Sequence, residues 1–85
     1  GGDRWVVGGR LDLRALSEAT GVELPPSRDY VTVAGFVMAR LGRIPAPGDR
    51  VVMSDTVIEV LVVQGTRVDA LQVSRQSRDD AGARA

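Results

Sequence analysis

Apolar residues recur at two different periods along this chain of 85 residues. Within residues 13–20 and 33–41, large apolar side chains recur every three or four positions, the spacing that places them on one face of a helix. From residue 50 onward, valine, isoleucine and leucine fill short runs separated by turn-forming segments such as Ser54-Asp55 and Gln64-Gly65-Thr66. The pattern therefore predicts two helices followed by a meander of three strands.

Capping residues define the ends of the first predicted helix, residues 13–20. Asp12 fits the N-cap, because its carboxylate can accept a hydrogen bond from a backbone N–H that has no partner within the helix. Leu11 and Leu16 have the spacing of a hydrophobic staple across this end. Gly21 fits the position just after the helix, where the backbone turns left-handed.

The second predicted helix begins after Thr32, its N-cap, and ends at Gly42. Gly35 lies in its first turn and costs up to ~1 kcal/mol of helix stability relative to alanine, so we expect a packing reason for it. Arg43 follows the helix and has two interpretations. It bonds the last helix carbonyls and complements the negative end of the helix dipole, which we favour, or it binds an anion.

The segment between this helix and the strands holds Pro45, Pro47, Gly48 and Asp49. Prolines and a glycine are typical of a turn, so the segment is predicted to lead the chain into the sheet. Asp49 is interpreted as a side chain that bonds the backbone of this turn, in preference to a metal or ligand contact. The glycines of the chain lack the spacing of a phosphate-binding loop and are interpreted as turn residues.

Four strands complete the predicted fold, over residues 4–7, 50–53, 56–63 and 67–73. The third of these is apolar on both faces apart from Glu59, so we expect it to be central, with the helices on one face and another element on the other. Glu59 is expected to face solvent, and the alternative is a cross-strand pair with Arg50 or Arg67. The order β-α-α-β-β-β predicts an α+β fold in which an antiparallel sheet packs on two helices, with the first strand in the same sheet.

The two ends of the chain have weak folding signals. Residues 1–3 are expected to fray, and residues 74–85 lack large apolar side chains, so they are predicted to be a disordered tail. The folded domain is therefore predicted to span residues 1–73. A start at Gly1-Gly2 in place of methionine indicates a fragment of a longer protein.

Composition excludes several classes of chemistry. The chain contains neither cysteine nor histidine, which excludes disulfides, cysteine nucleophiles and imidazole acid–base catalysis. Its 11 basic residues, all arginine, balance 11 acidic ones, so the basic excess of a nucleic-acid-binding protein is missing. The carboxylates are dispersed, so neither a metal site nor a catalytic residue is predicted. No apolar run approaches the ~20 residues that span a bilayer, so this fragment is not expected to insert into one.

Trp5 is the only tryptophan in the chain and lies near its start. A tryptophan in this position can close one end of the core. Tryptophan is also enriched at protein–protein interfaces. Both interpretations stay open, and Trp5 is kept as a candidate interface residue.

Five short motifs occur in order along the chain: Arg10-Leu11-Asp12-Leu13, Leu24-Pro25, Tyr30-Val31-Thr32-Val33-Ala34-Gly35, Gly42-Arg43-Ile44-Pro45 and Pro47-Gly48-Asp49-Arg50-Val51. Together they resemble the CorC/HlyC transporter-associated domain, the C-terminal module of haemolysin-C-like proteins. The resemblance covers residues 5–73, and its motifs are specific only in combination. Two positions depart from the pattern, since Val31 replaces the usual acidic residue and Gly8 stands where an aspartate is common.

This resemblance implies an α+β fold related to the flavin-binding domains of some oxidases. It does not imply a bound flavin, and no cofactor is predicted. It implies that the module's partners are the membrane domain and the CBS domains of a parent chain, and a second copy is a further candidate partner. The parent would be a bacterial inner-membrane protein linked to Mg²⁺ and Co²⁺ efflux, with this module on the cytoplasmic face. We expect a non-catalytic regulatory or interaction domain, and the alternative is a domain that senses a nucleotide or flavin.

Overall fold

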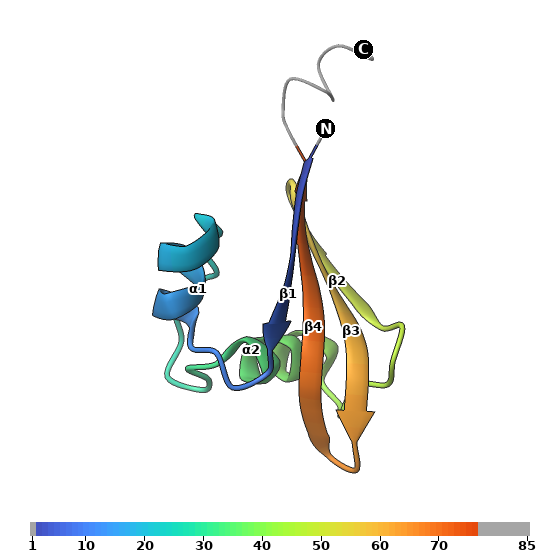
Figure 1. Ribbon diagram of the computed structural model, residues 1–85. Coiled ribbons are helices and arrows are strands. Elements are labelled where there is room, and N and C mark those ends of the chain that lie inside the picture. Colours follow the sequence, from blue (N-terminus) through green and yellow to red (C-terminus); the bar gives the residue numbers. More distant parts are fainter. Residues whose placement is uncertain (1, 77–85) are drawn as a thin grey trace.

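The computed structural model describes residues 2–76, which form an antiparallel sheet of four strands and two helices (Figure 1). The predicted α+β fold and element order are confirmed. The helices coincide with the two segments of helical period, and the strands coincide with the valine-rich runs. The elements are β1 (Gly2–Gly8), α1 (Leu13–Thr20), α2 (Val33–Leu41), β2 (Arg50–Met53), β3 (Thr56–Gln64) and β4 (Arg67–Gln76).

The sheet has the strand order β1-β4-β3-β2, and every neighbouring pair is antiparallel. The first strand of the chain therefore joins the same sheet as the meander, as predicted, and β3 and β4 are its central strands. The pairing of β3 with β4 changes register on both sides of Val62. Such an irregularity bends the strands and increases the local twist of the sheet.

Two strands extend beyond their predicted ends, and they do so together. β1 begins at Gly2, although residues 1–3 are predicted to fray. β4 runs three residues into the predicted tail. The added residues pair with each other, as Asp3 does with Arg75. The backbone hydrogen bonds of a ladder form without apolar side chains, so the composition of these segments did not indicate a strand. Gly1 and the remainder of the predicted tail, residues 77–85, lie outside the described residues.

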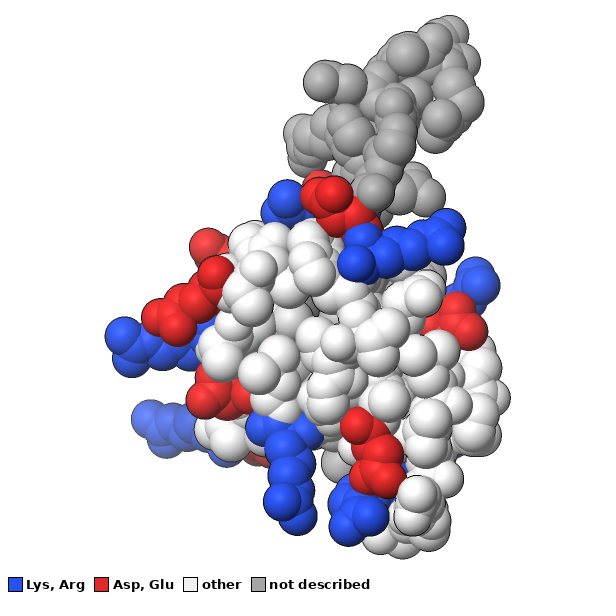
Figure 2. Space-filling view, in the orientation of Figure 1, with Lys and Arg blue, Asp and Glu red and all other residues white. Residues whose placement is uncertain are grey.

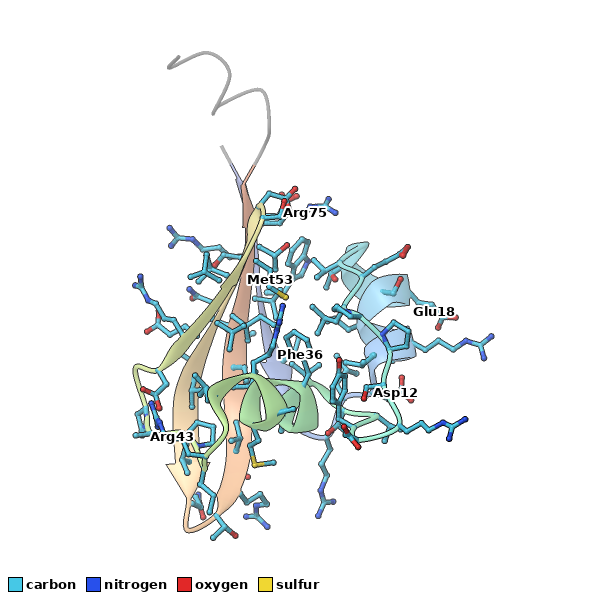
Figure 3. The ribbon with its side chains drawn as sticks, turned by 180° about the vertical axis from the view of Figure 1, so that it is seen from behind. Asp12, Glu18, Phe36, Arg43, Met53 and Arg75 are labelled. Atoms are coloured by element: carbon cyan, nitrogen blue, oxygen red, sulfur yellow. The ribbon has the colours of Figure 1, made fainter. Side chains whose placement is uncertain are left out.

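The core lies between the helices and one face of the sheet. α2 lies behind the sheet in Figure 1 and in front of it in Figure 3, so it covers that face. Full burial of a Val, Leu, Ile or Phe side chain contributes about 2 kcal/mol to stability. The layer of side chains between the helices and the sheet is therefore the main source of stability. The largest fully buried side chains are Phe36, Leu16, Ile58, Leu71, Val33, Val37, Val60 and Val73.

The opposite face of the sheet is not covered by any of residues 2–76. Val6 on β1, Val52 on β2 and Val62 on β3 are 67%, 68% and 43% exposed. Val6 alternates along its strand with Trp5 and Val7, which pack against the core, so Val6 points away from it. The expectation that another element lies on this face is therefore wrong for the described part of the chain.

Both predicted helices have the ends that their capping residues indicate. Asp12 Oδ1 and Thr32 Oγ1 each accept the backbone N–H three residues further on, at 2.7 and 3.1 Å. Gly21 and Gly42 follow the helices with φ angles of 78° and 72°. These are left-handed conformations that glycine adopts without steric cost. The helix bounds therefore match the prediction.

Candidate functional site

The two helices begin side by side. Asp12 and Thr32, their N-cap residues, form an isolated antiparallel bridge. The first N–H of each helix donates to the carbonyl that precedes the N-cap of the other helix, at 3.0 and 2.8 Å. These N–H groups have no partner inside their own helices. The two capping motifs therefore also fix the position of one helix relative to the other.

Gly9 allows the start of α2 to approach the sheet closely. The N–H of Ala34 donates to the carbonyl of Gly9 at 3.1 Å, and Gly9 itself is buried. A Cβ atom on Gly9 would lie 1.9 Å from the carbonyl oxygen of Val68 and 3.2 Å from the Ala34 Cβ. Only glycine fits between these elements, so Gly9 has a packing role that its interpretation as a turn residue missed.

Gly35 has the packing role that the sequence predicts. A Cβ atom on Gly35 would lie 2.9 Å from the Cβ of Tyr30 and 3.2 Å from Thr32 Oγ1. The Tyr30 ring meets Phe36 edge to face with centroids 5.4 Å apart, and its hydroxyl donates to the carbonyl of Pro25. Gly35 thus makes room for Tyr30, which ties the connection between the helices to the core.

Arg43 and Asp49 close the loop between α2 and β2, the region where Figure 3 labels Arg43. Arg43 Nη1 donates to Asp49 Oδ2 at 2.7 Å, and the N–H of Ala46 donates to the same oxygen at 2.7 Å. The bond from Arg43, followed by that from Ala46, lowers the pKa of Asp49 to about 2. The backbone role predicted for Asp49 is confirmed. The favoured interpretation of Arg43 is wrong, because its guanidinium pairs with Asp49 and the Ile44 carbonyl in place of the helix carbonyls.

The same loop is fastened to the centre of the sheet. The N–H of Gly48 donates to the carbonyl of Val60, and the N–H of Val60 donates to the carbonyl of Asp49, both at 2.8 Å. Gly48 has a φ of 96°, a left-handed conformation that favours glycine, and Pro45 is buried. The motif residues of this segment therefore shape and anchor backbone.

Glu59 pairs with Arg50 across β2 and β3. The two residues are partners in the strand register, and Arg50 Nη2 lies 3.5 Å from Glu59 Oε1. The expectation that Glu59 faces solvent without a partner is therefore wrong, and the cross-strand alternative is confirmed. Because the pair lies at the surface, its contribution to stability is small.

Trp5 lies at one end of the core. It pairs with Val73 in the register of β1 and β4, is half-buried, and packs against the buried cluster. This position agrees with the interpretation of Trp5 as a cap on the core. Its second interpretation, as an interface residue, stays a prediction.

A groove of about 550 Å³ lies between α1 and the connection that leads to α2. Its lining mixes apolar and charged side chains, and it includes Asp12, Leu24 and Tyr30 of the family motifs but neither Arg43 nor Asp49. The sequence signal for it is the pair Pro25-Pro26, which holds the connection extended beside the helix. Among the lining residues are Asp12, Arg14, Glu23, Leu24, Pro26 and Tyr30.

The described part of the chain contains no cluster of three carboxylates that could hold a metal ion. Within residues 2–76, every buried side-chain nitrogen or oxygen has a hydrogen-bond partner. Neither α1 nor α2 is long and apolar enough to cross a membrane. The polar motif side chains Asp12, Thr32 and Asp49 form capping and loop-closing hydrogen bonds.

The fold thus defines a class of protein: a small α+β domain. Its motif residues shape the helix ends and the loop before β2. The CorC_HlyC family, described as a transporter associated domain, matches residues 1–77. The chain belongs to this family.

Curated relatives are much longer than this chain. The chain is 37% identical over 76 residues to the inner membrane protein YoaE of Escherichia coli. The matched segment covers 88% of this chain and 15% of YoaE. It is 33% identical over 72 residues to the polyamine export protein of Salmonella typhimurium. This second match covers 84% of this chain and 16% of that protein. The chain thus spans about 15% of the length of the relatives it matches.

Solved structures of related domains have the same fold. The CorC_HlyC domain from Haemophilus ducreyi is 29% identical with a TM-score of 0.73, covering 88% of this chain and 99% of that chain. The transporter associated domain of a Xylella fastidiosa hemolysin, in complex with Mg²⁺ and Mn²⁺, is 28% identical with a TM-score of 0.75, covering 87% and 89%. Because the fold fills nearly the whole Haemophilus chain, a domain of this family folds without the rest of its parent protein.

Proposed function

We propose that this domain is a non-catalytic interaction module of a bacterial inner-membrane protein that exports small cations. Family membership over residues 1–77 carries the proposal. One relative is an inner membrane protein, and another is a polyamine export protein. The family resemblance implies Mg²⁺ or Co²⁺ as the exported cation. The relative that exports polyamines suggests an organic cation as the alternative.

The contacts of the motif side chains support a role without chemistry. Asp12, Thr32 and Asp49 each accept a hydrogen bond from a backbone N–H, and Arg43 is paired with Asp49. A general acid or base must reach the proton that it transfers, whereas these groups are occupied by the turns that they stabilise. The hydrogen bonds of these residues fix the shape of the domain surface. The membrane and CBS domains of the parent chain would bind this surface on the cytoplasmic side of the membrane.

The test compares the longer parent protein with and without residues 1–76. Cation efflux and chemical crosslinking of the assembly are measured for both forms, with Mg²⁺, Co²⁺ and a polyamine as separate substrates. We expect deletion to change assembly, efflux or both for at least one substrate. Identical assembly and identical efflux of all three would refute the proposal.

A domain that senses a nucleotide or flavin is the second candidate, and the groove beside α1 favours it. Arg43 and Arg50 do not favour it, because they are paired with Asp49 and Glu59. A thermal-shift comparison with ATP, AMP, FAD and Mg²⁺ tests this candidate. Ligand at a hundred times its Kd should add ~2.7 kcal/mol to the free energy of unfolding, and no shift with any of the four would exclude it.

A further inference from the structure

The groove beside α1, here called the α1 groove, is lined by residues between Asp12 and Val31, and its two walls are held in place. The N–H of Leu13 donates to the carbonyl of Val31 at 3.0 Å, which joins the start of α1 to the connection that leads to α2. Within that connection, the hydroxyl of Tyr30 donates to the carbonyl of Pro25. A ligand therefore meets a groove that is already formed, and little ordering entropy opposes its binding.

One part of the lining is apolar. Val31 is 70% exposed, so most of its side chain is available for contact with a ligand. Burial of such surface favours binding. A ligand that presents a hydrocarbon surface therefore gains from this part of the groove. The apolar lining residues are Leu13, Leu24, Pro26, Tyr30 and Val31.

The charged part of the lining is acidic on balance. Asp12 and Glu23 contribute two carboxylates, and neither is paired with an arginine within residues 2–76. Oδ1 of Asp12 accepts the N–H of Ala15, which leaves the second oxygen for another donor. Of the described lining residues only Arg14 is basic, and it lies 3.7 Å from Glu18. The groove therefore attracts a cation and repels the phosphates of a nucleotide.

The surface around α1 adds little to this attraction. Figure 2 shows acidic and basic side chains interspersed on the left side of the view, where α1 lies, with no broad area of one sign. The formal net charge of the chain is zero. Long-range steering is therefore weak, and a charged partner must be recognised by contacts within the groove.

The donor set of the groove suits an organic cation better than a metal ion. Ca²⁺ takes about six to eight oxygen ligands and Mg²⁺ a regular octahedral set, whereas the groove offers two carboxylates beside apolar side chains. An ammonium or guanidinium group on a hydrocarbon stem matches both parts of the lining. The stem covers apolar surface while the charged group reaches a carboxylate, as lysine and arginine side chains do elsewhere in proteins.

We infer that the α1 groove binds a segment of the parent membrane protein in which lysine or arginine stands next to an apolar residue. Cytoplasmic segments that border membrane spans are enriched in lysine and arginine. The inference thus rests on the proposed function, in which this module lies on the cytoplasmic side of such a protein. A segment of the same chain has a high effective concentration, about millimolar, so a groove lined largely by exposed side chains binds it without high intrinsic affinity.

Amide NMR titrations of the 85-residue chain with short capped peptides test the groove itself. The isolated chain is suitable, because a domain of this family folds alone. One peptide alternates leucine and arginine, a second has glutamate in place of arginine, and a third has glycine in place of leucine. We expect the first to bind with a Kd of roughly 0.1–1 mM, with shift changes centred on residues 12–31, and the others to bind about tenfold more weakly or less.

Matched variants locate the contact. Glu23→Gln should raise the Kd of the leucine–arginine peptide about fivefold, because the groove loses a carboxylate. Glu59→Gln removes the same charge from β3, outside the groove, and should leave the Kd unchanged.

A second pair of variants tests the apolar part of the lining and guards against misfolding of the first pair. Val31→Ser should raise the Kd about threefold. Val52→Ser, at a valine that is 68% exposed on β2, should not change it. The thermal unfolding midpoint of each variant shows whether its fold is intact.

Crosslinking in the longer parent protein identifies the segment that occupies the groove. A photoreactive group is attached to Val31→Cys, after replacement of any cysteines elsewhere in the parent, and the crosslinked peptide is identified by mass spectrometry. We expect a segment rich in lysine or arginine that borders a membrane span, and we expect Glu23→Arg to abolish that crosslink. Cation efflux is not a readout of either experiment, so failure of this inference is distinguishable from failure of the proposed transport function.

Several results would overturn the inference. The leucine–arginine peptide could show no binding at about 1 mM, or the glutamate peptide could bind equally well. The control variants could weaken binding as much as the groove variants do. Spermidine could bind the groove more tightly than the peptide, which would assign the groove to a free amine. Finally, the crosslink could fall on a segment without basic residues, which would assign the groove to a different partner.

Discussion

The backbone of Gly9 lies so close to the carbonyl oxygen of Val68 that no side chain fits between them. A Cβ atom on Gly9 would be 1.9 Å from that oxygen. The carbonyl of Gly9 also accepts the N–H of Ala34 at the start of α2. One glycine thus joins the sheet, the turn after β1 and the second helix.

We expect Gly9→Ala to destabilise the domain by about 3 kcal/mol or to prevent folding, because the backbone of β4 would have to move. Gly8→Ala is the neighbouring control. The nearest atom to a Cβ on Gly8 is 3.9 Å away, so its cost should stay below about 1 kcal/mol. Urea unfolding followed by circular dichroism measures both, and equal losses would show that the close approach is not limiting.

Gly35→Ala separates helix propensity from packing. In an open helix this change stabilises by up to ~1 kcal/mol. Here the new Cβ would lie 2.9 Å from the Tyr30 Cβ, so we expect a net loss of about 1–2 kcal/mol in urea unfolding. Ala39→Gly on the exposed side of α2 measures propensity alone, with an expected loss of ~1 kcal/mol. A Gly35→Ala domain more stable than the original would contradict the packing account.

The pair of Arg43 and Asp49 makes part of the stability depend on pH. The pKa of Asp49 is lowered from its ordinary 3.8 to about 2 in the folded state. A carboxylate with a lowered pKa stabilises the fold above its unfolded pKa, and that contribution disappears as the pH falls through the folded pKa. The contribution should therefore be complete above roughly pH 5 and nearly absent below roughly pH 2.

Asp49→Asn removes this titration. We expect a lower melting temperature than the original domain at about pH 6, and a difference that shrinks between about pH 4 and about pH 2. Arg43→Gln should show the same narrowing, because it removes the other half of the pair. A difference that stays constant over this pH range would mean that the ionised pair contributes nothing.

The ends of β1 and β4 support each other. A chain of residues 1–73 should be less stable than one of residues 1–76 by about 2 kcal/mol, because it loses the last backbone pairs of the β1–β4 ladder. It also loses Arg75, which lies 3.4 Å from the carbonyl of Gly21 and 3.9 Å from Asp3.

Arg75→Ala in the full chain separates the side chain from the ladder, and its cost should stay below about 1 kcal/mol. Equal unfolding midpoints for the two shortened chains would contradict the role of the ladder.

Local interactions made much of this fold predictable from the sequence. Asp12 and Thr32 bond an N–H three residues away, and Gly21 and Gly42 turn the chain directly after the helices. Such contacts depend on neighbouring residues only, so the helix bounds could be predicted without knowledge of the tertiary fold.

Contacts between distant segments could not be predicted in the same way. The need for Gly9 depends on Val68, which is far away in the sequence, and the partner of Arg43 depends on how the loop to β2 folds back. The strand at residues 74–76 exists because β1 lies beside it. That residues 2–76 leave one face of the sheet uncovered could be recognised only once the position of α2 was known.

We propose that the motif residues shape the backbone and take no part in chemistry. The sharpest test is the cation efflux proposed for the longer parent protein, measured for the Asp49→Asn variant at a temperature where the isolated variant domain is fully folded. We expect efflux equal to that of the unaltered protein. Loss of efflux from a variant that remains folded and assembled would show that Asp49 has a role beyond its loop.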